Sequence, residues 1–269
     1  MKEDYEKSFN EGLANLAIDP DVLAQELAAE LVGDPLDEID FDEFDSGDKN
    51  VAQECESGLK WLKEGHEERL QGLKVFCEHR DPRALPLLIP LLQEPCPVER
   101  MSAVYALGRN PCPRAVEILL QILKTDSNAY VRKATAWSLG NYADEAVLHP
   151  LINSLQNDVA AVRLWASGSL AEAGSISKVK AEMASSQLLT SLHIDSEPVV
   201  RSNCIWSLGR LYEHLTESMQ NDVVDAFIAV LLSDGESSVR YEARIALDQI
   251  DSPSIQKRMN LLIEEGLVS

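Results

Sequence analysis

Apolar and polar positions along the chain follow a pattern that returns every few dozen residues. In its fullest form the pattern reads Val-Arg-x-x-Ala-x-x-x-Leu-Gly, and its clearest copies span residues 131–140 and 200–209. An apolar residue stands seven positions after each repeat arginine. The six repeat arginines, at intervals of 31, 32, 31, 38 and 39 residues, are Arg69, Arg100, Arg132, Arg163, Arg201 and Arg240. A period of this length is typical of repeat proteins.

Two helices fit within each repeat. An aspartate five or six residues before the arginine marks the start of one helix, as at Asp126 and Asp195. Apolar stretches at helical spacing, such as 115–123 and 147–155, supply the other helix. A hairpin of this size cannot bury its apolar face alone and must stack on its neighbours. The sequence therefore predicts an all-α fold, an α-solenoid of about six helical hairpins. The longer intervals predict an extended first helix over about 176–192 and a longer turn near 214–218.

Charge divides the chain into two parts. The net charge is −21, and residues 1–50 hold 16 acidic residues against 3 lysines, which gives −13 and leaves −8 for the rest. We therefore divide the chain into an acidic N-terminal extension, 1–50, with one short helix after Pro20, and a repeat region, 51–269. Such a balance disfavours nucleic acid and anionic membrane surfaces as partners. With no apolar run long enough for a span and no signal core, the expected location is cytoplasmic.

The acidic extension contains a segment with apolar anchors. Residues 34–48 carry eight acidic residues and no basic one, interleaved with Leu36, Ile39, Phe41 and Phe44. One interpretation is a solvated, partly disordered arm. The other is a docking arm, in which Ile39, Phe41 and Phe44 anchor the segment on a basic groove of this chain or of a partner.

The repeat unit resembles a known family. Asp-Pro-Arg-Ala, an apolar helix, an Asp loop and Val-Arg-x-x-Ala-x-x-x-Leu-Gly together resemble the HEAT-like repeats of the phycobilisome (bilin) lyase type, over roughly residues 51–265. The acidic extension and the Trp-Ser-Leu-Gly copies are most similar to cyanobacterial HEAT-repeat proteins that bind an A-type iron–sulfur scaffold. The resemblance implies a solenoid that serves as a scaffold, with an iron–sulfur scaffold or a phycobiliprotein as partner.

Helical geometry separates a buried face of each arginine-bearing helix from an exposed one. At 100° per residue, the Val before the arginine, the small residue at +3 and the Leu at +7 cluster on one side, so positions +1, +5 and +9 point away. These positions carry large side chains, which predicts an aromatic groove on the concave surface. An alternative is that the aromatics pack against the next repeat or under the acidic arm. The predicted partner-binding residues are Met101, Tyr105, Arg109, Trp137, Asn141, Trp165, Trp206, Arg210 and Tyr241.

Candidate chemistry changes this picture little. The repeat arginine is best explained as a structural contact between adjacent units. Cys96 and Cys112 bracket one helix at opposite ends and cannot share a metal ion or a disulfide within that repeat. The five histidines lack metal-ligand spacing, and no catalytic set stands out. We expect no catalytic, metal or cofactor-binding residue, with bilin or haem as the only alternative cofactors.

The sequence favours a non-enzymatic adaptor or chaperone that binds a protein partner in the aromatic groove. In this hypothesis the acidic arm tunes access, with its carboxylates meeting Arg109 and Arg210. Two alternatives stay open. One is a subunit of a heterodimeric bilin lyase or isomerase, which would be enzymatic, and the other is a phycobilisome-disassembly factor.

Overall fold

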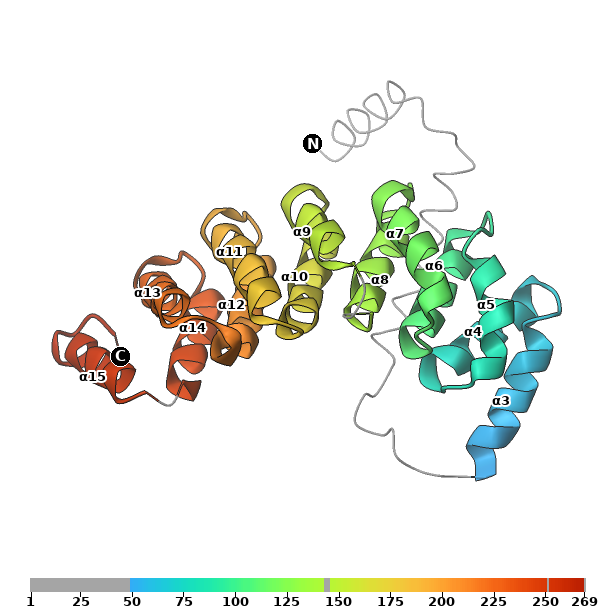
Figure 1. Ribbon diagram of the computed structural model, residues 1–269, viewed down its shortest axis with the longest axis horizontal. Coiled ribbons are helices and arrows are strands. Elements are labelled where there is room, and N and C mark those ends of the chain that lie inside the picture. The colour runs from blue at the N-terminus through green and yellow to red at the C-terminus, as the bar shows by residue number, and fades with distance from the viewer. Residues whose placement is uncertain (1–48, 143–145, 251, 269) are drawn as a thin grey trace, which may run out of the picture.

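The computed structural model describes residues 49–142, 146–250 and 252–268. The predicted short helix after Pro20 and the docking-arm residues Ile39, Phe41 and Phe44 lie outside the described residues. Within them the chain forms an elongated stack of helical hairpins that runs from α3 at one end to α15 at the other (Figure 1). No strand is present in this part of the chain, so the predicted all-α solenoid is confirmed.

Six hairpins and one further helix make up the stack. The first hairpin begins two residues before the predicted start of the repeat region. The α-helices are α3 (Lys49–Trp61), α4 (His66–Glu78), α5 (Leu85–Leu91), α6 (Pro97–Arg109), α7 (Val116–Thr125), α8 (Ala129–Gly140), α9 (Leu148–Asn157), α10 (Ala160–Ser175), α11 (Lys178–Ile194), α12 (Pro198–Leu211), α13 (Glu217–Ser233), α14 (Ser237–Gln249) and α15 (Pro253–Glu264). Short 3₁₀ turns at Pro82–Ala84, Pro113–Ala115 and Tyr212–His214 precede α5, α7 and α13.

The helices form two layers. The even-numbered helices α4 to α14 each carry one repeat arginine and pack closely on the even-numbered helices before and after them, whereas neighbouring odd-numbered helices barely touch. The closely packed layer of a curved stack lies on its concave side. We therefore call α4, α6, α8, α10, α12 and α14 the inner layer, and their solvent-facing side the inner face.

The predicted buried face lies in the core between the layers. Val131 and Leu139 of α8 are fully buried, as are the equivalent Val200 and Leu208 of α12. The long interval after Arg163 is explained by α11, which begins two residues later than predicted and ends at Ile194. Burial of these branched side chains, at about 1.5–3 kcal/mol each, is the main force that joins the hairpins.

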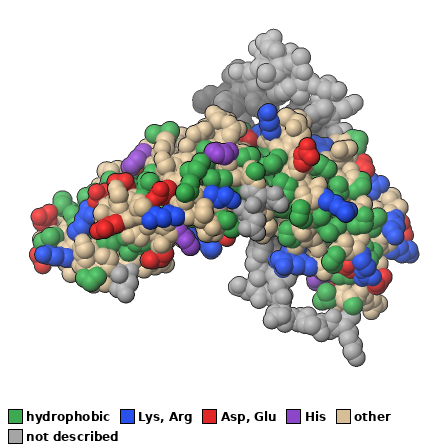
Figure 2. All heavy atoms as spheres, in the orientation of Figure 1, with side chains coloured by type: hydrophobic (Ala, Val, Ile, Leu, Met, Phe, Trp, Pro, Cys, Tyr) green, Lys and Arg blue, Asp and Glu red, His purple; other side chains and the backbone are tan. Residues whose placement is uncertain are grey.

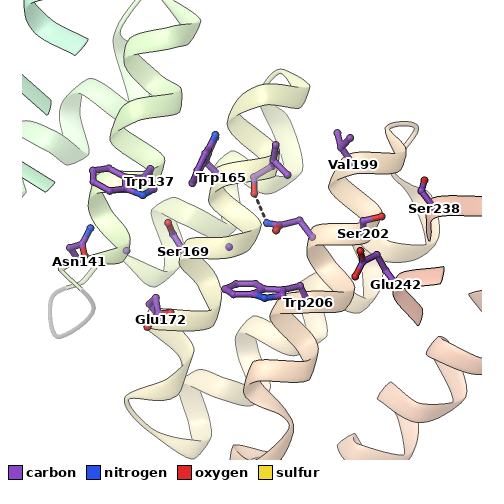
Figure 3. Close-up of a pocket in the computed structure, with 14 residues that line it drawn as sticks. Trp137, Asn141, Trp165, Ser169, Glu172, Val199, Ser202, Trp206, Ser238 and Glu242 are labelled. Atoms are coloured by element: carbon purple, nitrogen blue, oxygen red, sulfur yellow. Dashed lines mark hydrogen bonds between the residues drawn. The ribbon is translucent and has the colours of Figure 1, made fainter. Parts of the chain in front are cut away.

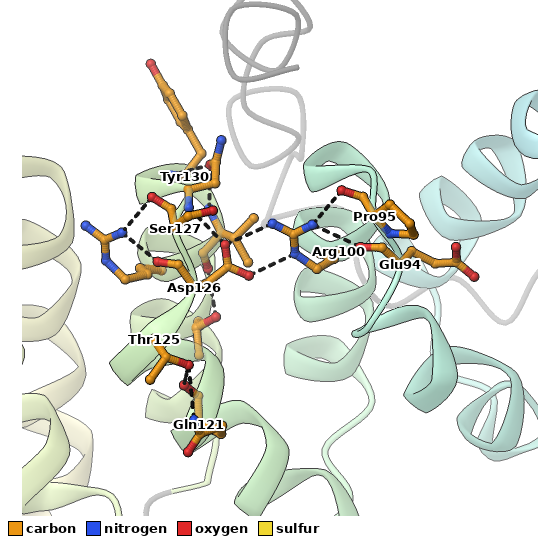
Figure 4. Close-up of polar contacts among 12 residues, drawn as sticks. Glu94, Pro95, Arg100, Gln121, Thr125, Asp126, Ser127 and Tyr130 are labelled. Carbon is orange, nitrogen blue, oxygen red and sulfur yellow. Dashed lines mark hydrogen bonds and ion pairs between the residues drawn. The ribbon is translucent and has the colours of Figure 1, made fainter. Parts of the chain in front are cut away.

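Four of the six repeat arginines bind an aspartate in the loop of the next hairpin, so the predicted contact between adjacent units is confirmed at these junctions. Arg100 donates two hydrogen bonds to Asp126 in the next repeat, at 2.8 and 2.9 Å, and its third nitrogen donates to the carbonyls of Glu94 and Pro95 in its own loop (Figure 4). The same bidentate contact joins Arg132 to Asp158, Arg163 to Asp195 and Arg201 to Asp234. Planar forks of this kind fix both distance and orientation, so they set the spacing of the stack.

Two of the carboxylates in these contacts, those of Asp195 and Asp234, have a pKa below the usual value. Hydrogen bonds from Arg201 lower the pKa of Asp234 below its usual value, against the effect of burial. Burial alone raises the pKa of Asp195, but hydrogen bonds from Arg163 and from the Glu197 N–H outweigh it, and the net shift is downward. Both aspartates are therefore charged at neutral pH.

Among the described helices, none has the length and apolar character that crossing a bilayer requires. Figure 2 shows acidic, basic and apolar side chains interspersed over the visible face of the stack.

Candidate functional site

An open cleft of about 760 Å³ lies on the inner face between α8, α10, α12 and α14. Figure 3 shows Trp137, Trp165 and Trp206 arranged around it, one from each of three consecutive inner helices. We call it the tryptophan cleft. Its lining residues are Trp137, Gly140, Asn141, Leu164, Trp165, Gly168, Ser169, Glu172, Val199, Ser202, Asn203, Trp206, Ser238 and Glu242.

The cleft arises from the residues at one position of the repeat. Trp137 on α8 and Trp206 on α12 both stand five residues after their repeat arginine. On α10, between them, the same position is Gly168, which has no side chain to fill the space. Trp165 lies three residues before Gly168 and forms a further side of the hollow. An aromatic, a glycine and an aromatic in the same register therefore create the cavity.

Hydrogen bonds hold the floor of the cleft together. Ser169 of α10 donates to the carbonyl of Ala136 on α8 at 2.8 Å. Asn203 of α12 donates to the carbonyl of Leu164 and to the Ser167 hydroxyl, both at 2.8 Å. These contacts bring the inner helices close together. The cleft is thus built on a rigid base rather than on loops.

Glycine at the end of the repeat motif permits the close approach. A Cβ on Gly140 would lie 2.8 Å from the Ser169 hydroxyl, and a Cβ on Gly108 would lie 2.4 Å from the Trp137 ring. At Gly209, which stands at the same motif position, nothing lies within 4 Å. The glycine of the motif is therefore a steric requirement at the first two positions and not at the third.

Charged side chains frame the aromatic rings. Lys133 lies 5.9 Å from the centre of the Trp165 ring, and Arg210 lies 5.0 Å from that of Trp206. Both contacts are cation–π pairs. Arg210 also forms an ion pair with Glu172 at 2.9 Å. Glu242 on α14 adds a carboxylate at the far end of the cleft.

Four of the predicted partner-binding residues line the tryptophan cleft. They are Trp137, Asn141, Trp165 and Trp206, and Trp206 is 46% exposed. Arg210 lies beside them through its contact with Trp206. Tyr241 on α14 is 65% exposed but is not part of the lining.

The predicted exposure of Met101 and Tyr105 is wrong. Met101 is 2% exposed and Tyr105 is 1% exposed, and nearly the whole of α6 is buried. The Tyr105 ring packs edge-on against Trp137 of the next repeat, with 5.5 Å between the ring centres. For Tyr105 the alternative interpretation, packing against the next repeat, is confirmed.

Arg109 lies outside the cleft, at the end of α6. Its guanidinium donates a long hydrogen bond, 3.4 Å, to the carbonyl of Glu78. Burial lowers the pKa of Arg109, and the nearby positive charge of Arg80 lowers it further. Two cations therefore lie together at this end of the inner face.

Sequence reasoning missed the residues that make the cleft concave. Gly168, Ser169, Ser202 and Asn203 have small or polar side chains, whereas the predicted groove rests on large ones. The signal was present, since Gly168 interrupts the aromatic series at the +5 position.

Among the described residues, the cysteines and the possible metal ligands form no site beside the tryptophan cleft. Cys55, Cys77 and Cys204 are buried, and burial raises the pKa of the Cys204 thiol far above its usual value. Within residues 49–142, 146–250 and 252–268, no cluster of His, Cys, Asp or Glu could hold a metal ion. The arrangement is suited to binding by shape and aromatic contact.

Comparison with known proteins agrees with this architecture. The family model for HEAT repeats matches residues 59–139 and 116–209. No curated protein matches the chain significantly. Among solved structures, the chain is similar to one in the complex of CpcE and CpcF of phycocyanin lyase from Nostoc sp. PCC7120, with 25% identity and a TM-score of 0.52, covering 62% of this chain and 99% of that one.

Two further structures share the fold alone. A designed armadillo repeat protein in complex with the peptide (KR)4 has 19% identity and a TM-score of 0.54, over 72% of this chain and 98% of that one. Kap121p has 16% identity and a TM-score of 0.57, over 85% of this chain and 28% of that one. Because the HEAT model matches more than half of the residues, the chain belongs to the HEAT repeat family.

Proposed function

We propose that this chain is a protein-binding adaptor or chaperone that holds a segment of a partner in the tryptophan cleft. The observation that carries the proposal is the meeting of three tryptophans from three consecutive repeats around one open hollow. Tryptophan is prominent among residues that dominate binding energy at protein interfaces. The rigid floor beneath the rings means that little ordering entropy is lost on binding.

The dimensions of the cleft limit what it holds. It spans three steps between inner helices, from α8 to α14. At 8–10 Å per step this is about 24–30 Å. An extended segment of about seven to nine residues covers that length, as does a helix of about 16–20 residues. The partner therefore contributes one short continuous segment.

The partners implied by the sequence resemblance are a phycobiliprotein and an A-type iron–sulfur scaffold. The similarity to the CpcE and CpcF complex supports the first of these. In both cases the repeat protein would act by holding its partner. A role in phycobilisome disassembly would require direct binding to assembled phycobiliprotein and is a special case of the first partner.

The test uses a substitution that fills the cleft without removing a tryptophan. Gly168→Trp places a large ring in the hollow, whereas Gly168→Ala adds one methyl whose nearest neighbour, the Asn203 amide nitrogen, lies 3.2 Å away. Partner capture from a lysate of the source organism, quantified by mass spectrometry, is run with both variants and with the double change Trp137→Ala plus Trp206→Ala. We expect Gly168→Ala to retain the partner.

The cleft-filling variant and the double tryptophan variant should each lose it, by at least about 30-fold in affinity, since a single interface hot spot contributes about 2 kcal/mol or more. Circular dichroism confirms that the variants are folded. Equal recovery of the same partner from all folded variants would refute the adaptor proposal.

A second candidate function is a bilin lyase or isomerase subunit, favoured by the similarity to the phycocyanin lyase structure. In that case the rings would stack on a flat tetrapyrrole. Co-expression with a bilin pathway discriminates the two functions. A lyase subunit should purify with visible bilin absorbance that Gly168→Trp abolishes, whereas an adaptor should purify colourless.

A further inference from the structure

The inner face is basic at its N-terminal end. Lys74 of α4 stands at the same register as Trp137 and Trp206, five residues after its arginine, and is exposed. Arg80 follows α4 and lies close enough to Arg109 for their charges to repel. Lys133 of α8 lies at the border with the tryptophan cleft, over the Trp165 ring. We call Lys74, Arg80, Arg109 and Lys133 the basic end. It stands out in a chain whose net charge is −21.

The described chain begins at the edge of the stack where Arg80 and Arg109 lie. Because α3 and α4 form an antiparallel hairpin, the N-terminal half of α3 lies beside the C-terminal end of α4. Glu54 of α3 contacts His79 at 2.8 Å, and Glu56 contacts Arg83 at 2.5 Å. The described chain therefore begins on the same side of the stack as the C-terminal end of α4, which Arg80 follows.

We propose that the chain's own segment 34–48 docks on the basic end of the inner face. Charge complementarity is the first argument, since the segment holds eight acidic residues and no basic one. In 0.1 M salt the screening length is about 10 Å, so carboxylates of the segment that lie within this distance of the lysines and arginines are attracted to them with little screening. The segment also offers Ile39, Phe41 and Phe44, which could contact the aromatic side chains that adjoin Lys133.

The length of the chain decides which part of the inner face the segment reaches. Phe44 is five residues before Lys49 and Ile39 is ten, which is at most about 17 and 35 Å of extended chain. Inner helices are about 8–10 Å apart, so α8 lies about 16–20 Å from α4 and α12 about 32–40 Å. All three anchors are therefore within reach of the basic end, and Ile39 and Phe41 are within reach of the α8 side of the cleft. Arg210 on α12 lies near the limit of the fully extended chain even for Ile39, and it already pairs with Glu172.

This docking goes beyond the proposed function, because it concerns a different part of the inner face and does not depend on a partner. It has a functional consequence nonetheless. A segment that meets Lys133 borders Trp165, so the docked arm and a bound partner would compete at one end of the tryptophan cleft.

Zero-length carbodiimide cross-linking of the full chain tests the proposal. The reagent joins a carboxylate to a lysine amine only when the two are in contact, and mass spectrometry identifies the pair. We expect cross-links from residues 34–48 to Lys74 and Lys133, and their loss in about 1 M salt, where the screening length is about 3 Å. The exposed Lys178 of α11 and Lys257 of α15 serve as internal controls. Cross-links spread equally over the control lysines would overturn the proposal, as would their complete absence.

Two further experiments distinguish docking within one molecule from exchange between molecules and from the absence of docking. A mixture of isotope-labelled and unlabelled protein shows whether a cross-link lies within one chain, and links between labelled and unlabelled copies would overturn the proposal in favour of exchange between molecules. In a variant with the acidic residues of 34–48 changed to their amides, lysine acetylation of Lys74 and Lys133 should become severalfold faster, with Lys178 unchanged. Unchanged acetylation at all three lysines would contradict docking.

Discussion

Removing one charge from an arginine–aspartate contact between hairpins should destabilise the stack far more than removing one from an exposed ion pair. The chosen change is Asp195→Asn, and the matched control is Glu172→Gln. Both convert a carboxylate that pairs with an arginine into an amide of the same shape. The side chains of Arg163 and Asp195 are 18% and 5% exposed, whereas those of Arg210 and Glu172 are 52% and 44% exposed.

The magnitude follows from the contacts. Asp195 accepts from Arg163 at 2.7 and 2.8 Å and from the N–H of Glu197 at 2.9 Å. Hydrogen bonds to charged groups contribute about 1.5–3 kcal/mol each, and losing one partner of a buried pair costs about 3–5 kcal/mol. The amide keeps part of this geometry, so we expect a loss of about 2–4 kcal/mol. An exposed pair contributes about 0–1 kcal/mol, which bounds the effect of the control.

Urea unfolding followed by circular dichroism measures both variants. Amide hydrogen exchange shows which hairpins lose stability, because stability in a repeat array is a sum of local and nearest-neighbour contributions. Protection should fall in the hairpins on either side of the contact, α9–α10 and α11–α12. If Asp195→Asn shifts the unfolding midpoint no more than Glu172→Gln does, the arginine contacts do not stabilise the stack and the reasoning fails.

Two other predictions follow from the same geometry. The folded-state pKa values of Asp195 and Asp234 are depressed, so the stability that these charges contribute is complete above the unfolded-state pKa, about 3.9, and is lost as pH falls through the lower folded-state values. In Asp234→Asn the free energy of unfolding should therefore fall less steeply with pH below about pH 4. An unchanged dependence of the unfolding free energy on pH in this range would contradict the prediction. Gly108→Ala should destabilise the fold by about 1–3 kcal/mol and alter tryptophan fluorescence, because the new Cβ would meet the Trp137 ring. Gly209→Ala, where nothing lies within 4 Å, should stabilise the fold by about 0.5–1 kcal/mol. Thermal melts that show the same direction of change for both variants would refute the steric explanation.

The parts of the fold that repeat were predictable from the sequence. The arginine and the loop aspartate recur in register, which predicts contacts between arginines and loop carboxylates of adjacent units, and Arg132 and Asp158 form such a contact. The buried valine and leucine positions followed from helical periodicity in the same way. Both depend on interactions that recur from one hairpin to the next.

Features that depend on how far apart neighbouring helices lie were not predictable. A single-helix projection places Tyr105 on the outward side of α6, yet its ring is buried against Trp137, because the projection contains no information about the adjacent helix. The hollow at Gly168 was not predictable for the opposite reason. It is created by the absence of a side chain, whereas the predicted groove rests on large side chains.

The origin of the hollow bears on how such proteins diversify. On α8, α10 and α12 the same repeat position borders the cleft, so the location of the cavity depends on which of these repeats carries the glycine. Exchanging or duplicating a whole hairpin would shift the cavity by one helix spacing, about 10 Å, while every arginine junction stays intact. Recombination of repeats can therefore generate new binding surfaces while the scaffold keeps its fold. The order of small and aromatic residues at this position then determines the shape of the surface that a partner meets.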